Sequence, residues 1–172
     1  GYGYVLKSSG EYVLLESINM AFKLFERIKT SDTAEKQNKE KAAEEKEKHF
    51  HDIFINLPVM MHSIDEQGYI VDVNNQWLKE FGYSREEVLG RKSTDFLTPE
   101  SRRYAVESAM PEYFRKGFAY NVYYQFQKKN GELMDTLLSA ISEKDGEGNF
   151  VHSMAVIVNI SEQIRAQSAL QE

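Results

Sequence analysis

The sequence contains no cysteine, only three prolines in 172 residues, and no apolar run near the roughly 20 residues that span a bilayer. The lack of cysteine excludes disulfides, thiolate nucleophiles, cysteine-based zinc sites and any flavin adduct formed through sulfur. Positive charge is also scarce, with 21 Lys and Arg against 27 Asp and Glu, which argues against nucleic-acid binding. Residues 1–20 lack the features of a signal peptide, so we expect a cytoplasmic chain without membrane contact.

The composition divides the chain into four segments, and we expect a piece of a longer protein because the sequence begins with Gly1. Residues 1–29 carry the pattern of a hairpin and a helix, which predicts the tail of a preceding domain or a cap. Residues 30–52 lack glycine and proline and mix acids with lysines, which predicts a charged connector helix, either a signal transmitter or a merely solvated helix. Residues 53–160 form a mixed domain, and residues 161–172 form its exit helix.

The first half of the mixed domain begins with strand patterns at residues 59–65 and 69–73. Asn74 and Asn75 are suited to cap a following helix, which Gly82 ends. Ser84 and the glutamate three residues after it form a capping box that opens a second short helix. These local signals predict two strands followed by short helices.

The second half carries one longer helix and three strands. The helix begins with Pro99 in its first turn, runs to about residue 116, and should bend near Pro111, which lacks an amide hydrogen. Strand patterns follow at residues 118–128, 133–143 and 150–159, joined by tight glycine turns. Together the elements predict an α+β fold with one sheet and helices on one face.

Three segments, in this order, resemble the PAS domains of bacterial signalling proteins over about residues 53–163: VNNQWLKEFGYSREEVLG at 73–90, KKNGE at 128–132 and NISEQ at 159–163. The resemblance implies a five-stranded antiparallel sheet whose helices enclose a pocket against its inner face. It also implies a sensory role in signal transduction, of the kind found in two-component systems.

The third segment departs from the family pattern. Asn159 stands where aspartate is usual and Gln163 where arginine is common, so an ion pair credited with coupling the core to the exit helix is unavailable. We still expect the signal to leave the domain through this segment, that is, through Asn159, Ile160, Ser161 and Glu162.

Known cofactors of the family fit the sequence poorly. The resemblance implies that a covalent flavin needs a cysteine, which is absent, and that a haem sensor needs a histidine on the helix at residues 99–116, which has none. Haem through His62 and non-covalent FAD beside Trp77 or the tyrosines stay open, although the sequence favours structural hydrogen bonds for His62 and a core position for Trp77. His49 and His51 lie two apart on a helix and cannot chelate one ion. The cofactor stays unknown, and a metal site is not expected.

The pocket wall is predicted from the longer helix and the strands that face it. We expect a small polar or aromatic ligand to contact aromatic and apolar side chains there: Tyr104, Met110, Tyr113, Phe114, Tyr120, Val122, Tyr124 and Ile157. The alternative is that these side chains fill the core and leave no cavity.

A second apolar surface is predicted on the outer face of the sheet, where Met154, Val156 and Val158 need cover. The helix before the first strand carries an apolar stripe at helical spacing, formed by Phe50, Ile53, Phe54 and Leu57. We expect the stripe to cover the outer face of its own sheet or of a partner's sheet. In the second case the chain forms a homodimer.

No catalytic set stands out in the sequence, because serine, histidine and acid orderings, phosphate-binding glycine loops and paired carboxylates are lacking. We therefore expect a sensory module that detects a small ligand or a conformational signal and relays it through its flanking helices to an effector domain. The alternative is a PAS domain without a ligand that acts in homodimerisation or protein docking.

Overall fold

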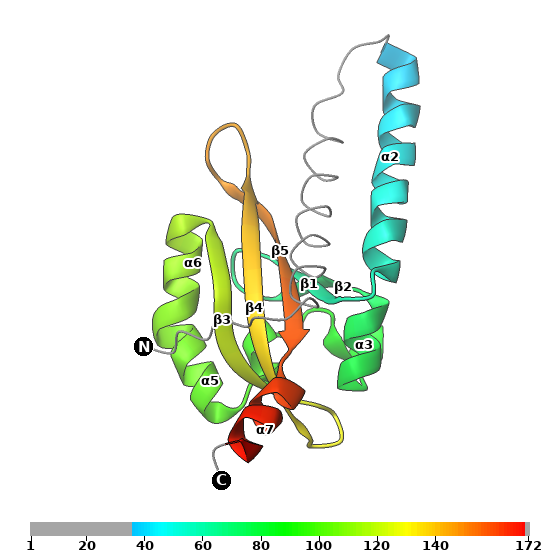
Figure 1. The fold of residues 1–172 in the computed structure, drawn as a ribbon. Helices are drawn as coiled ribbons and strands as arrows, with labels where there is room; N and C mark the ends of the chain where they lie inside the picture. The colour runs from blue at the N-terminus through cyan, green and yellow to red at the C-terminus, as the bar shows by residue number, and fades with distance from the viewer. Residues whose placement is uncertain (1–35, 171–172) are drawn as a thin grey trace. The chain divides into compact units, whose positions relative to one another are not determined.

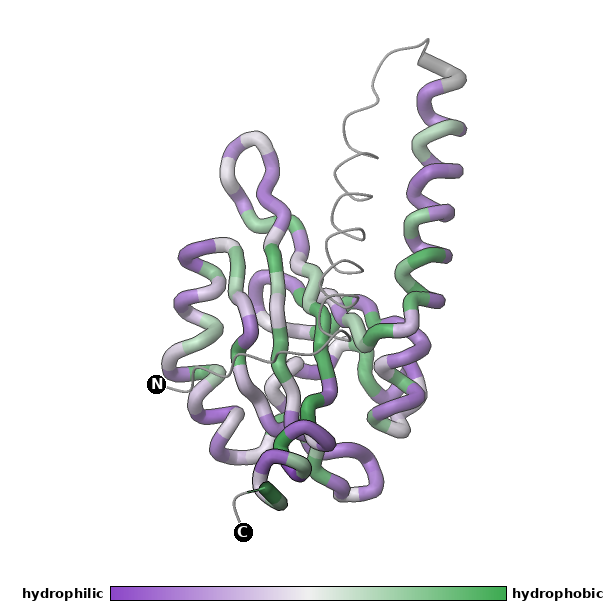
Figure 2. The backbone as a smooth tube through the Cα atoms, viewed as in Figure 1, coloured by the Kyte–Doolittle hydropathy of each residue, from purple (hydrophilic) through white to green (hydrophobic). Residues whose placement is uncertain are grey.

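The computed structural model describes residues 36–170, and the chain forms two compact units that divide between Ile53 and Phe54. The described part of the first unit belongs to helix α2 (Lys36–Asn56), which has a polar sequence over most of its length (Figure 2). A helix is thus observed over most of the predicted connector. The hairpin and helix predicted for residues 1–29 lie outside the described residues. No helix within residues 36–170 combines the length and the apolar character needed to cross a membrane.

The second unit is built on one antiparallel sheet in the order β2-β1-β5-β4-β3 (Figure 1). Its strands are β1 (Met60–Ile64), β2 (Ile70–Val73), β3 (Phe118–Gln127), β4 (Leu133–Lys144) and β5 (Phe150–Asn159). The two early strands and the three late strands therefore join through the β1–β5 pair at the middle of the sheet. The predicted five-stranded α+β fold is confirmed.

Helices fill the connection between β2 and β3. They are α3 (Asn75–Phe81), α4 (Arg85–Val88), the 3₁₀ turn η1 (Ser93–Phe96), α5 (Pro99–Tyr104), the π-helical turn η2 (Ala105–Ala109) and α6 (Met110–Lys116). The exit helix α7 (Ser161–Ala169) follows β5. The helix predicted for residues 99–116 is interrupted by the π-helical turn η2 just before Pro111, which cannot donate the regular backbone bond to the preceding turn.

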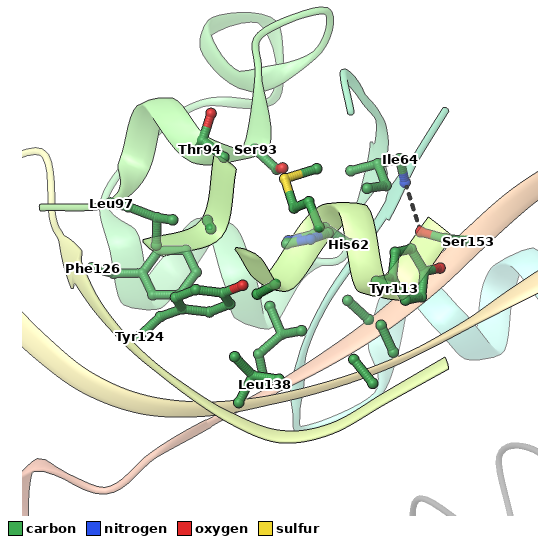
Figure 3. A pocket seen from close by; sticks show the side chains of 17 residues that line it. His62, Ile64, Ser93, Thr94, Leu97, Tyr113, Tyr124, Phe126, Leu138 and Ser153 are labelled. Atoms are coloured by element: carbon green, nitrogen blue, oxygen red, sulfur yellow. Dashed lines mark hydrogen bonds between the residues drawn. The ribbon is translucent and has the colours of Figure 1, made fainter. Parts of the chain in front are cut away.

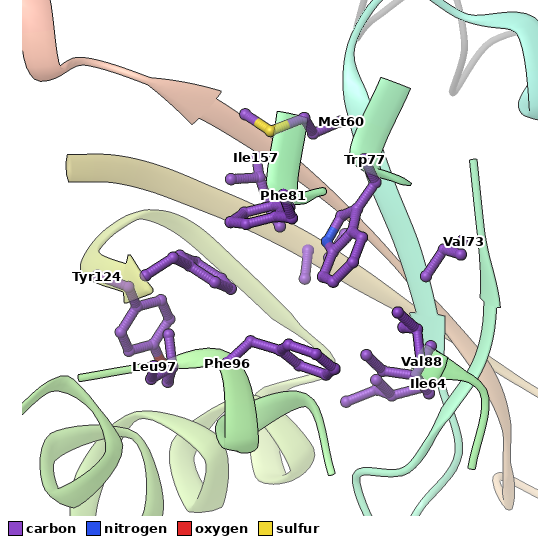
Figure 4. Packing of buried hydrophobic residues seen from close by; sticks show 14 of the residues in the cluster. Met60, Ile64, Val73, Trp77, Phe81, Val88, Phe96, Leu97, Tyr124 and Ile157 are labelled. Atoms are coloured by element: carbon purple, nitrogen blue, oxygen red, sulfur yellow. The ribbon is translucent and has the colours of Figure 1, made fainter. Parts of the chain in front are cut away.

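An aromatic cluster from these helices packs on the inner face of the sheet (Figure 4). The ring centroid of Trp77 lies 4.3 Å from that of Phe81 and 5.2 Å from that of Phe96. Phe81 in turn lies 5.1 Å from Phe126 on β3. All four side chains are buried, so this aromatic cluster forms part of the hydrophobic core.

Asn74 joins the sheet to the first helix of the connection. Its Oδ1 accepts hydrogen bonds from the N–H of Trp77 at 3.1 Å and from the N–H of Met61 at 2.9 Å. Its Nδ2 donates to the carbonyls of Val59 at 2.6 Å and Leu57 at 3.3 Å. The side chain thus caps α3, as predicted, and also satisfies backbone groups at the start of β1, although it is fully buried.

Replacing Asn74 with alanine should lower the free energy of unfolding by roughly 2–4 kcal/mol, because the cap is lost and buried backbone groups lose their partner. Asn75→Ala is the matched control, since Asn75 is exposed one residue later and should change stability by less than about 0.5 kcal/mol. Urea denaturation of both variants measures the difference. Equal stabilities would contradict the role given to Asn74.

Candidate functional site

A cavity of about 60 Å³ lies between the inner face of the sheet and helices α5 to α6 (Figure 3). It exists because many of the side chains that meet there are small: Ala105, Ala109, Ala119, Ala140 and Ala155. Larger apolar side chains complete the wall: Ile64, Leu97, Met110, Val122, Phe126 and Leu138. The alternative that core side chains leave no space is therefore wrong for this structure.

His62 is the principal polar residue of the cavity. It lies in β1, paired with Val73 on β2 and Ala155 on β5, and only 4% of it is exposed. Its Nδ1 is buried without a hydrogen-bond partner. Burial lowers the pKa of His62 from 6.5 to about 4, so the imidazole is neutral at physiological pH.

Hydroxyl groups supply the rest of the polar lining: Ser93, Thr94, Tyr113, Tyr124 and Ser153. Burial raises the pKa of both tyrosines, although the hydroxyls of Ser153 and Ser142 counter part of the rise at Tyr113. The Tyr113 hydroxyl is buried without a hydrogen bond of normal geometry. The cavity is therefore apolar over much of its wall, with a few uncharged polar groups.

Only half of the residues predicted for the pocket wall line the cavity. Met110, Tyr113, Val122 and Tyr124 line the cavity, and their role as ligand contacts stays a prediction. Four others do not line it: Tyr104, Phe114, Tyr120 and Ile157.

Tyr120 does not line the cavity with Val122 and Tyr124, because β3 contains a bulge. The register between β3 and β4 shifts between Ala119 and Val122, and Asn121 has a φ of 52°. The irregularity brings Ala119 to the cavity and leaves Tyr120 63% exposed.

The three other residues outside the cavity have separate reasons. Tyr104 ends α5 and is half exposed, although its ring still lies 6.2 Å from that of Tyr124. Phe114 packs on Phe150, with ring centroids 5.5 Å apart. Ile157 lies further along β5, where it pairs with Met60 in the hydrophobic core (Figure 4).

A family model described as "PAS domain" matches residues 57–162, well over half of the chain. The chain belongs to the PAS domain family. The comparison with curated proteins gives no match.

Solved PAS domains share the fold. One from Colwellia psychrerythraea is 16% identical with a TM-score of 0.61 and covers 67% of this chain and 97% of its own. A PAS domain of an HTR-like protein from Haloarcula marismortui is 24% identical, with a TM-score of 0.55 and coverages of 73% and 100%. A PAS domain from a two-component sensor histidine kinase is 17% identical, with a TM-score of 0.58 and coverages of 68% and 98%.

The cavity of this PAS domain does not fit the cofactors left open by the sequence. Pockets for drug-sized ligands measure roughly 300–1,000 Å³, and a flavin or a haem needs at least that space. Trp77 is fully buried in the aromatic cluster, so it offers no free face to a flavin. Within residues 36–170, no group of three or more histidines and acids could hold a metal ion.

The exit segment of this PAS domain is bonded to β4. The backbone carbonyl of Asp135 accepts a hydrogen bond from the Ile160 N–H at 2.8 Å. The backbone N–H of Asp135 donates to the Ser161 Oγ at 2.9 Å. Asn159 Oδ1 accepts from the Ser161 N–H at 2.9 Å. Glu162 lies in the first turn of α7 and is exposed. Three of the four predicted relay residues thus take part in bonds at the start of α7.

The residues predicted to form an interface are buried or half-buried. Met154 and Val156 are buried and Val158 is half-buried. On α2 and after it, Phe54 is buried, and Phe50, Ile53 and Leu57 are half-buried. Their role in a homodimer stays a prediction.

Sequence reasoning did not place Ala105, Ala109, Ala119, Ala140 or Ser153 in the pocket wall, and it gave His62 no firm role. The alanines come from three strands and one helical turn, so no short motif contains them. The available signal was a histidine inside an otherwise apolar strand, MMHSI.

The neutral state of His62 predicts a pH dependence of stability. Because the unfolded chain binds a proton at a pKa near 6.5 and the folded chain only near 4, stability is full above pH 6.5 and decreases as the pH falls toward 4. The loss should reach roughly 3 kcal/mol. Urea denaturation at several pH values should show this slope in the wild type and less of it in His62→Leu. An NMR titration that placed the His62 pKa at 6 or above would contradict the prediction.

Filling the cavity should stabilise the domain. Ala109→Leu adds three carbons beside empty space and should raise the free energy of unfolding by about 1–2 kcal/mol. If the core were already filled, the same change would cost about 1–3 kcal/mol through overpacking. Ala166→Leu, on an exposed site of α7, is the control for helical alanine-to-leucine changes. Urea denaturation measures whether Ala109→Leu raises or lowers the free energy of unfolding.

Proposed function

We propose that this PAS domain detects a small ligand in the cavity beneath its sheet and relays the change through residues 159–162 to an effector domain of the full-length protein in the cytoplasm. The observation that carries the proposal is the buried, unpartnered Nδ1 of His62 in the cavity wall. A buried polar atom without a partner costs roughly 1–3 kcal/mol, and a ligand that bonds to it recovers that cost.

A continuous set of hydrogen bonds supports the relay. On α5, the Ser101 Oγ accepts from the backbone N–H of Gln125 at 2.9 Å, and the next helical turn lines the cavity through Ala105. The Gln125 side chain donates to the Asp135 Oδ1 at 3.1 Å. Asp135 in turn binds the backbone of Ile160 and the hydroxyl of Ser161. Movement of α5 is thereby linked to the start of α7 without an ion pair.

The likeness to a PAS domain of a two-component sensor histidine kinase supports a place in signal transduction. In this proposal the effector is an output domain that is connected to the PAS domain through α7. At 17% identity the likeness supports the class of system rather than the signal.

Native and denaturing mass spectrometry of the purified chain test the proposal. We expect the native wild type to carry an added small-molecule mass that denaturation releases, and Ala109→Leu to lack it because its side chain occupies the cavity. A ligand-free native homodimer in both proteins would contradict ligand sensing. It would support the alternative, a docking module that uses the stripe of Phe50, Ile53, Phe54 and Leu57.

A further inference from the structure

Two polar groups on different strands point into the same cavity (Figure 3). The His62 ring comes from β1 and the Tyr124 hydroxyl from β3, so the two groups approach from different parts of the sheet. A neutral imidazole offers one donor and one acceptor, and a phenol hydroxyl offers both. A ligand between them therefore meets both donors and acceptors.

The cavity wall contains no formal charge, since its described residues include no Lys, Arg, Asp or Glu. An ion buried there would lose its hydration without gaining an opposite charge, which is far more costly than burying a neutral polar group. The wall therefore selects an uncharged ligand.

The volume sets the size of the occupant. One water needs about 10–15 Å³ of such space. The cavity of about 60 Å³ is larger than this and far smaller than the roughly 300–1,000 Å³ of pockets for drug-sized ligands, so it suits a molecule of a few non-hydrogen atoms.

We propose that the cavity takes a compact, uncharged molecule of a few non-hydrogen atoms that carries a hydrogen-bond donor and acceptor, as a primary amide or a small alcohol does. His62 and Tyr124 bind its polar end, and the alanines surround its apolar end. This inference rests on the proposed function, because it names the ligand class of the same site.

Propionamide and propionate are the probes, because they have nearly the same shape and differ in charge. Each is titrated into the full chain at neutral pH while amide resonances are followed by NMR. Propionamide should shift the resonances of cavity residues and bind at least tenfold more tightly than propionate. Equal or tighter binding of propionate would overturn the inference.

Variants test the two polar contacts. Tyr124→Phe removes only a hydroxyl and should weaken propionamide binding about five- to tenfold, the value of one hydrogen bond. His62→Leu should weaken it to a similar extent. Tyr123→Phe is the matched control, because the Tyr123 hydroxyl donates to Asp135 at 2.5 Å and does not line the cavity. Equal loss in the control, or no loss in Tyr124→Phe, would contradict the assignment.

Xenon separates this inference from the proposed function, because it enters apolar cavities without hydrogen bonding. Under xenon pressure the wild type should show shifts at Ala140 and Ala155, and Ala109→Leu should not. Xenon binding without preferential propionamide binding would overturn the ligand class alone. If neither probe reached the cavity, ligand sensing itself would fail.

Discussion

The shortage of side-chain volume beneath the sheet is the constraint on which the site depends. Alanines stand at facing positions on three strands and on the π-helical turn, so the inner layer cannot close over the strands around His62. The aromatic cluster fills the other part of the same interface. One sheet face therefore carries both a packed core and a cavity. The packed core fixes the position of the helices that line the cavity.

The cavity determines the chemistry of the groups that line it. Removal from water keeps His62 neutral and makes the tyrosine phenols harder to ionise. A ligand in the cavity would therefore form its hydrogen bonds with uncharged groups. The bonds at the start of α7 also use uncharged side chains, because Asn159 provides an amide oxygen and Ser161 a hydroxyl group.

Local signals made much of the fold predictable. Asn74, Gly82 and the turn at Gly131 act within a few residues, and each is found where the sequence placed it. The cavity wall was predicted only in part, because a bulge at Asn121 turns Tyr120 away from the cavity. This bulge has a non-glycine residue with positive φ, which carries no clear sequence signal. The alanines are distant in sequence, so their convergence depends on strand register. The position of His62 in the cavity wall likewise depends on how β1 pairs with β2 and β5.

The central claim is that occupancy of the cavity is transmitted to the exit helix. Amide spectra of the wild type and Ala109→Leu test it most directly, since the leucine occupies the cavity in the absence of any ligand. The account predicts shifts at the cavity wall and also at Asp135, Ile160 and Ser161, with little change in the distant turn at residues 145–149. Shifts confined to the cavity wall, with Ser161 unchanged, would contradict it.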